Sequence, residues 1–193
     1  MNLISRRKHI RMGTAKENRL MDSKAMTHAI EKLASEIAEN FPGSELKDMA
    51  LLGIQHRGVL LAERIYEKLF ALTRNKPHYG TVDISMYRDD IWLKKILPKI
   101  LETRIPFDVN DRNIVLVDDV LSTGRTIRAA LDAITDYGRP KTIRLAVLVD
   151  RKNHEFPIFA DFTGMKYTVR PEERVCVSFK DIDGEDLVYT KLY

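Results

Sequence analysis

The amino-acid sequence predicts an α/β fold in which helices cover both faces of a central, mainly parallel β-sheet. Short, wholly apolar runs alternate along the chain with amphipathic stretches of helical period, and such runs are typical of strands buried on both faces. Polar clusters directly follow several apolar runs, which is where open α/β sheets bind their ligands. The 193 residues, 44% hydrophobic and 31% charged, fit a single globular domain with a sizeable core.

The first half of the chain is predicted to hold two helices and two strands. Asp22 and Ser23 are good N-caps, and apolar residues then recur at helical spacing as far as Ala38. The expected elements are a helix over residues 22–40, a strand over 49–54, a helix over 59–72 and a strand over 81–87, followed by a charged turn at 88–90.

The second half continues the alternation. The expected elements are a strand over residues 113–117, a helix over 126–137 with Gly138 as its stop, a strand over 143–149 and shorter β-like pieces over 156–162 and 175–179. Between the halves, Pro98 and Pro106 prevent one long helix over 91–111, and residues 99–105 fit a further strand. Strands that alternate with helices imply right-handed crossovers and therefore a parallel sheet.

The positive charge of the chain is concentrated at its start. The net charge is +4, yet residues 1–20 hold six basic groups and one acid, so the remainder is close to neutral. We expect residues 1–21 to be a flexible basic extension and residues 22–193 to be the folded domain. A nucleic-acid-binding arm and a targeting peptide are the alternatives for the extension, which lacks the apolar segment of a secretory signal.

The remaining composition narrows the class of protein. The only cysteine, Cys176, cannot form an internal disulfide, which favours a reducing, cytoplasmic location and excludes a CxxC zinc site. No stretch approaches the roughly 18 apolar residues that cross a bilayer, so no membrane partner is expected.

The chemistry is concentrated in residues 113–126, NIVLVDDVLSTGRT. An apolar strand ends in two carboxylates, Asp118 and Asp119, and a loop of small residues then opens a helix. Backbone N–H groups and hydroxyls at a helix N-terminus bind anions, and carboxylates nearby suit sugar hydroxyls. The segment therefore predicts a ribose-phosphate site. It contains neither a Walker loop nor a GxGxxG fingerprint.

This segment resembles the phosphoribosyl-pyrophosphate motif of type I phosphoribosyltransferases. Further blocks resemble one family among them, the pyrimidine operon attenuation regulators that are also uracil phosphoribosyltransferases (PyrR). The blocks are IQHRGVLLAERI (54–65), VDISMYRDDI (82–91), IPFDV (105–109), VLVDDVLSTGRTIRAALDAITDYGRP (115–140), LAVLVDR (145–151) and FPIFADFTG (156–164). The resemblance implies the type I fold, with a small hood region beside the sheet.

The resemblance also implies a set of site residues. Asp118 and Asp119 would hold the ribose hydroxyls, and Arg57 and Arg88 would meet the diphosphate; these four are the expected catalytic residues. The expected substrate-binding residues also include His56, Gly58, Val120, Leu121, Ser122, Thr123, Gly124, Arg125, Thr126, Arg151 on the base side and Tyr167, whose backbone would read the base. No resident metal is expected, because Mg²⁺ would arrive with the diphosphate substrate.

The implied reaction joins uracil to phosphoribosyl diphosphate and gives UMP and diphosphate, in a protein expected to be a homo-oligomer. The family also implies UMP-responsive binding of a pyrimidine operon mRNA leader. Glu31 and Ser35 stand where the family has RNA-associated threonine and histidine, and His154 lies in a segment that departs from the family's RNA-binding pattern. Two alternatives stay open: an attenuator with little enzyme activity, and a phosphoribosyltransferase for another base.

Overall fold

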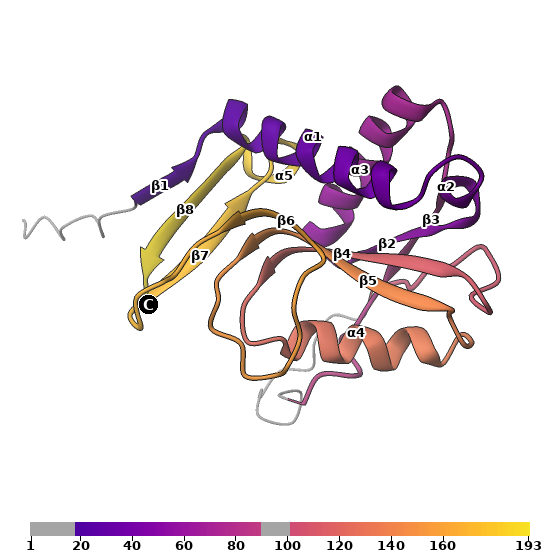
Figure 1. The fold of residues 1–193 in the computed structure, drawn as a ribbon. Coiled ribbons are helices and arrows are strands. Elements are labelled where there is room, and N and C mark those ends of the chain that lie inside the picture. Colours follow the sequence, from indigo (N-terminus) through magenta and orange to yellow (C-terminus); the bar gives the residue numbers. More distant parts are fainter. Residues whose placement is uncertain (1–17, 90–100) are drawn as a thin grey trace, which may run out of the picture.

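The computed structural model describes residues 18–89 and 101–193. Its centre is a five-stranded parallel sheet in the order β3-β2-β4-β5-β6 (Figure 1). The strands are β2 (Ala50–Ile54), β3 (His78–Val82), β4 (Asn113–Leu121), β5 (Thr142–Asp150) and β6 (Phe162–Lys166). The α/β fold class predicted from the sequence is confirmed.

Helices cover both faces of this sheet. Helices α1 (Ser23–Asn40) and α3 (Arg57–Thr73) pack on one face and α4 (Arg125–Thr135) on the other (Figure 1). The short α2 (Glu45–Asp48) joins α1 to the sheet. The N-terminus of α1 is capped as the sequence suggests, because the Asp22 carboxylate accepts a hydrogen bond of 2.8 Å from the backbone nitrogen of Ala25.

A second, antiparallel sheet forms the hood, which we define as β1 (Asn18–Met21), β7 (Glu173–Ser178), α5 (Lys180–Asp183) and β8 (Leu187–Leu192). Its strand order is β1-β8-β7, and it lies beside the carboxyl ends of the central strands (Figure 1). The sequence predicted β7 only, as residues 175–179. The last four residues of the expected extension form β1, while residues 1–17 lie outside the described residues, so a flexible extension there stays a prediction.

Two predicted strands are shifted in the structure. The strand expected over 81–87 is β3, which ends at Val82 because the carboxylate of Asp83 accepts a 3.0 Å hydrogen bond from the Ser85 nitrogen and turns the chain. The piece expected over 156–162 is mostly loop, because pairing with β5 begins only at Phe162. Of the strand considered over 99–105, the described part contains a single bridge, between Arg104 and Thr81.

No helix in residues 18–89 and 101–193 is both long enough and apolar enough to cross a membrane.

Candidate active site

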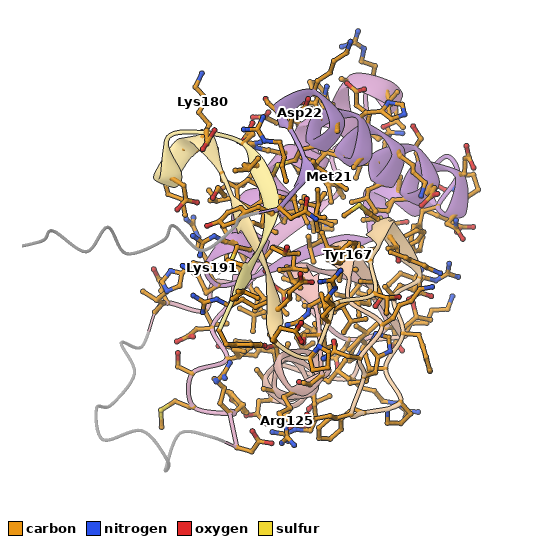
Figure 2. All side chains as sticks on the ribbon, turned by 90° about the vertical axis from the view of Figure 1, so that its left-hand side faces the viewer. Met21, Asp22, Arg125, Tyr167, Lys180 and Lys191 are labelled. Carbon is orange, nitrogen blue, oxygen red and sulfur yellow. The ribbon has the colours of Figure 1, made fainter. Side chains whose placement is uncertain are left out.

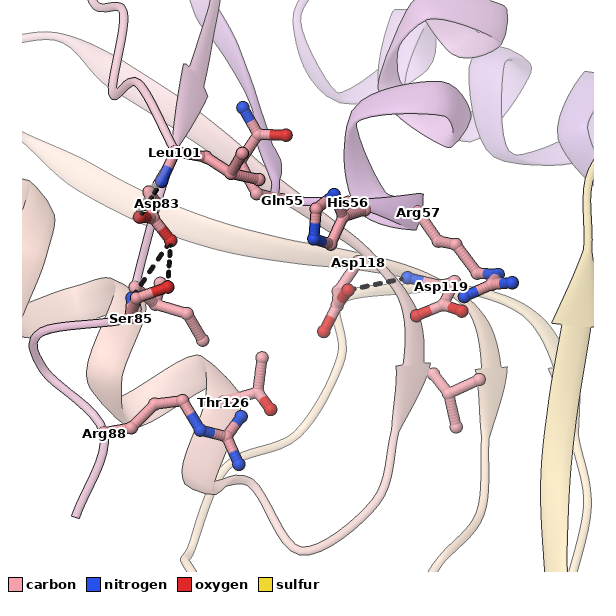
Figure 3. Close-up of a pocket in the computed structure, with 12 residues that line it drawn as sticks. Gln55, His56, Arg57, Asp83, Ser85, Arg88, Leu101, Asp118, Asp119 and Thr126 are labelled. Atoms are coloured by element: carbon pink, nitrogen blue, oxygen red, sulfur yellow. Dashed lines mark hydrogen bonds between the residues drawn. The ribbon is translucent and has the colours of Figure 1, made fainter. Parts of the chain in front are cut away.

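A cavity of about 490 Å³ lies at the carboxyl edge of the central sheet (Figure 3). The loops after β2 and β3, the end of β4 and the first turn of α4 form its walls. Its lining residues are Gln55, His56, Arg57, Asp83, Ile84, Ser85, Arg88, Leu101, Asp118, Asp119, Val120 and Thr126. Seven of the residues expected from the sequence are among them: His56, Arg57, Arg88, Asp118, Asp119, Val120 and Thr126.

Two adjacent carboxylates form the floor of the cavity. Asp118 is buried and Asp119 is partly buried, and the backbone nitrogen of Asp119 donates a 3.0 Å hydrogen bond to Oδ1 of Asp118. Burial raises the pKa of both carboxyls, and the neighbouring Asp119 charge raises the pKa of Asp118 further. The positive charge of Arg57 acts in the opposite direction on Asp119. The floor is therefore a pair of carboxylates that is costly to bury without hydroxyl or cationic partners.

The loop between β4 and α4 presents an anion-binding end of a helix. Gly124 has a φ of +90°, and a Cβ atom there would lie 3.2 Å from Cβ of Phe156. The carbonyl oxygen of Thr123 accepts hydrogen bonds from the backbone nitrogens of Glu155 (2.9 Å) and Phe156 (3.1 Å), which fixes the loop. Because the first N–H groups of α4 have no partners within the helix, they suit a phosphate next to Thr126.

The loop between β2 and α3 approaches the carboxylates from the other side. The Gln55–His56 peptide bond is cis, and α3 begins immediately afterwards at Arg57. A Cβ atom at Gly58 would lie 2.5 Å from the carbonyl oxygen of Val117, so only glycine allows this close approach of α3 to β4. Figure 3 shows the His56 ring above Asp118 and the Arg57 side chain extending beside Asp119.

Asp83 organises the third wall, and sequence analysis did not assign it to the site. Its carboxylate accepts hydrogen bonds from the Ser85 nitrogen (3.0 Å), the Ser85 hydroxyl (2.7 Å) and the Leu101 nitrogen (2.8 Å). It thereby holds together the loop that carries Arg88. The sequence analysis placed Asp83 inside the strand expected over 81–87, so no local signal marked it as a site residue. Gln55, Ile84, Ser85 and Leu101 also line the cavity without having been expected.

Arg125 lies outside the cavity lining. Its guanidinium forms ion pairs with Asp89 (2.6 Å) and Glu155 (2.7 Å), and Figure 2 shows it at the edge of the molecule, away from Tyr167. The side chain therefore links the start of α4 to the two loops that carry Asp89 and Glu155. The remaining expected residues of this group also lie outside the cavity lining: Gly58 in α3, Leu121 at the end of β4, and Ser122, Thr123 and Gly124 in the loop that follows β4.

The two residues expected on the base side connect β5 to neighbouring strands. Arg151 is buried, and its Nη2 atom donates a 3.0 Å hydrogen bond to the carbonyl oxygen of Glu173 at the start of β7. The backbone nitrogen of Tyr167 donates to the carbonyl oxygen of Asp150 at 2.8 Å. Neither residue lines the 490 Å³ cavity, so their expected contacts with a base stay predictions.

Comparison with known proteins identifies the family of the chain. The sequence-family model described as "Phosphoribosyl transferase domain" matches residues 17–180. "Bifunctional protein PyrR" of Clostridioides difficile (strain 630) is 48% identical over 172 residues, which cover 89% of this chain and 96% of that protein. The protein of the same name from Deinococcus radiodurans is 45% identical over 175 residues, covering 91% and 94%.

Solved structures show the same fold at low sequence identity. The hypoxanthine phosphoribosyltransferase of Trypanosoma cruzi superposes with a TM-score of 0.69 at 16% identity, covering 93% of this chain and 98% of the other. A hypoxanthine-guanine phosphoribosyltransferase of Bacillus anthracis gives 0.65 at 16%. These likenesses establish the type I phosphoribosyltransferase fold, whereas the closer sequence relatives establish the family. The chain belongs to the PyrR family of phosphoribosyltransferase-domain proteins.

Proposed function

We propose that the protein transfers a 5-phosphoribosyl group from phosphoribosyl diphosphate to uracil, giving UMP and diphosphate. One observation carries the proposal. The paired carboxylates Asp118 and Asp119 share a single cavity with Arg57 and Arg88 and with Thr126 at the start of α4. Such a cavity offers groups for each part of the sugar phosphate: anion donors at two ends and carboxylates between them.

The proposed placement of the donor substrate follows from these charges. The 5-phosphate would bind the N–H groups at the start of α4 and the Thr126 hydroxyl, because the N-terminus of a helix favours anions. The ribose hydroxyls would donate hydrogen bonds to Asp118 and Asp119. The diphosphate would then lie toward Arg57 and Arg88, whose guanidinium groups match the geometry of phosphate oxygens.

Mg²⁺ would enter as part of the diphosphate substrate. Among the described residues, no group of three or more His, Cys, Asp or Glu side chains is arranged to hold a metal by itself. Two carboxylates at the cavity floor nevertheless fit a magnesium ion that keeps substrate oxygens and water as its other ligands. The ion would supply positive charge to the departing diphosphate.

The reaction breaks the bond between ribose C1 and the diphosphate oxygen and forms a bond between C1 and N1 of uracil, which loses its proton. Positive charge develops on C1 while negative charge develops on the diphosphate. The protein's contribution is to fix both ends of the sugar phosphate and to stabilise the leaving charge with Arg57 and Arg88. No protein nucleophile is required for this displacement.

The test is UMP formation from uracil, phosphoribosyl diphosphate and Mg²⁺ by the purified protein. The double variant Asp118→Asn/Asp119→Asn should lose activity, while Asp48→Asn, at the exposed end of α2, should keep it. Absence of UMP with the unchanged protein would refute the proposal. Activity with hypoxanthine and not with uracil would instead identify a phosphoribosyltransferase for another base.

The second proposed function is UMP-responsive binding of a pyrimidine operon mRNA leader. The relatives named above are called bifunctional, which favours a second activity here as well. Filter binding with and without UMP tests it: binding that ignores both leader sequence and UMP would refute regulation. A homo-oligomer and a cytoplasmic location belong to the same proposal, and sedimentation and cell fractionation test them.

A further inference from the structure

We propose that Asp183, in the hood, is a positioning residue that holds Arg57 ready for the diphosphate. Nη2 of Arg57 lies 3.0 Å from Oδ1 and 3.3 Å from Oδ2 of Asp183, so both carboxylate oxygens accept from one guanidinium nitrogen. The two residues are far apart in sequence and join the start of α3 to the last residue of α5. The inference rests on the proposed function, because it assigns a purpose to the orientation of Arg57.

The carboxylate of Asp183 is itself held in place. Its Oδ2 atom accepts a 2.9 Å hydrogen bond from the backbone nitrogen of Phe179, and the Asp183 nitrogen donates to the Phe179 carbonyl oxygen at 2.7 Å. The Phe179 side chain is fully buried in the core that α1 and α3 share with the hood. Asp183 therefore presents its charge from a fixed turn rather than from a mobile tail.

A second arginine of α3 anchors the same turn. Nη2 of Arg64 lies 2.8 Å from carboxylate oxygens of both Asp181 and Asp186, and its guanidinium stands 5.0 Å from the centre of the Phe179 ring. The two arginines lie about two helical turns apart on one face of α3, and both bind carboxylates in or next to α5. Because Arg64 fixes the turn, Asp183 can hold Arg57 without moving toward it.

The exposed part of the Arg57 guanidinium can meet a ligand. The side chain is 40% exposed, and its hydrogen bonds to described residues all come from Nη2 and go to Asp183. The Nε atom, in contrast, is buried and has no hydrogen-bond partner among those residues. Arg57 and Asp119 also line a second cavity of about 350 Å³, which extends under the hood and includes Asp183 and Lys191. The guanidinium thus stands at the junction of two cavities, with Nη2 bound to Asp183 and its exposed edge open to a diphosphate oxygen.

Loss of the Asp183 charge should release Arg57. The positive charge of Arg57 also acts on Asp119. A released Arg57 side chain would therefore be drawn toward Asp119, a carboxylate that the ribose hydroxyls need. Ordering a long side chain upon binding costs about 0.5–1.5 kcal/mol, which corresponds to roughly 2- to 12-fold in affinity. We therefore expect Asp183→Asn to weaken binding of the diphosphate part of the substrate by about 3- to 10-fold.

The matched control is Asp181→Asn in the same short helix. Asp183→Asn keeps an oxygen that accepts from the Phe179 nitrogen, and Asp181→Asn leaves Arg64 paired with Asp186, so both variants should fold. In UMP synthesis, Asp183→Asn should raise KM for phosphoribosyl diphosphate and leave kcat and KM for uracil within about twofold, while Asp181→Asn should change none of them. Asp183→Glu, which restores the charge, should lie between Asp183→Asn and the unchanged protein.

Calorimetric binding of inorganic diphosphate with Mg²⁺ separates this inference from the proposed function. It needs no acceptor base, so it can support or refute the role of Asp183 even if no UMP is made. Equal or tighter diphosphate binding by Asp183→Asn would overturn the inference, because Asp183 would then be neutral or a competitor for Arg57. An equal loss in Asp181→Asn would overturn it as well, since the effect would then belong to the turn as a whole.

Discussion

Gly58 lies in direct contact with Asp118. A Cβ atom at Gly58 would stand 3.2 Å from both Cα and Oδ1 of Asp118, and 2.5 Å from the carbonyl oxygen of Val117. The start of α3 is thus packed on the end of β4, and this contact brings the diphosphate side of the cavity next to its carboxylates.

Gly58→Ala is expected to push these two walls apart. Overpacking of this kind costs about 1–3 kcal/mol of unfolding free energy, because backbone atoms cannot move aside as a flexible side chain can. Urea unfolding should show that loss, and KM for phosphoribosyl diphosphate should rise. Gly43→Ala serves as the control: φ is +61° there with no atom within 4 Å of the added Cβ, so it should lose stability through backbone strain alone and keep its KM. A normal KM in Gly58→Ala would contradict the role assigned to the contact.

Asp118→Asn should stabilise the protein at neutral pH while reducing its activity. The pKa of Asp118 in the folded protein is raised above its ordinary value of 3.8, chiefly by burial. The folded state therefore binds this proton more tightly than the unfolded state, and stability falls as pH rises from the unfolded pKa through the folded one. An amide of the same shape removes that loss and still accepts the hydrogen bond from Asp119.

Thermal unfolding at several pH values checks this sign. Tm of Asp118→Asn should exceed that of the unchanged protein at pH 7, and the difference should shrink as the pH falls below 3.8, where the carboxyl becomes protonated in both states. Activity should fall by about 10- to 150-fold, the value of a hydrogen bond to a charged group. A Tm difference that grows on acidification would show that the carboxylate stabilises the folded state.

Thr126 and Arg125 should differ in their effect on substrate binding, although they are neighbours in the motif. Thr126 lines the cavity, whereas Arg125 pairs with Asp89 and Glu155 outside it. Thr126→Val should raise KM for phosphoribosyl diphosphate about tenfold through loss of a hydroxyl donor to phosphate. Arg125→Gln should change KM by less than about twofold, since exposed ion pairs contribute about 0–1 kcal/mol. The reverse order would place the Arg125 guanidinium on the substrate.

The contrast between β4 and the hood shows what sequence patterns can and cannot predict. The apolar run that ends in Asp118 and Asp119 predicts both the strand and its chemistry, because burial on both faces and a polar end are local properties. The pairing of Arg57 with Asp183 joins segments 126 residues apart, and no local pattern specifies it. In β8, buried residues alternate with partly buried ones, but residues 187–192 show no such alternation of apolar and polar types in sequence, and the sequence analysis assigned no element there.

The sequence motif also could not predict in which direction the Arg125 side chain points. The TGRT segment correctly indicated a loop that opens a helix, yet its arginine turns to Asp89 and Glu155, which lie on two other loops. Asp83 was missed because it fell inside the strand expected over 81–87. Its role becomes visible only when Ser85 and Leu101 are seen to donate to it.

Glu31→Gln is expected to strengthen binding of a pyrimidine operon leader RNA. Oε1 of Glu31, on α1, lies 2.6 Å from Nζ of Lys68 on α3, and this ammonium lowers the pKa of the Glu31 carboxyl. Glu31 thus pairs with Lys68, which could otherwise contact an RNA phosphate. The negative charge of Glu31 also repels the RNA backbone. Filter binding over a range of salt concentrations should show tighter binding by the variant and a salt slope steeper by about 0.7, the value of one added contact to single-stranded nucleic acid.

Glu39→Gln, which changes an exposed acid on the same helix, should alter neither the affinity nor the salt slope if the effect belongs to the Glu31–Lys68 pair. An unchanged affinity in Glu31→Gln would place the RNA on another surface, because removal of an acid from a contact face must strengthen binding to a polyanion.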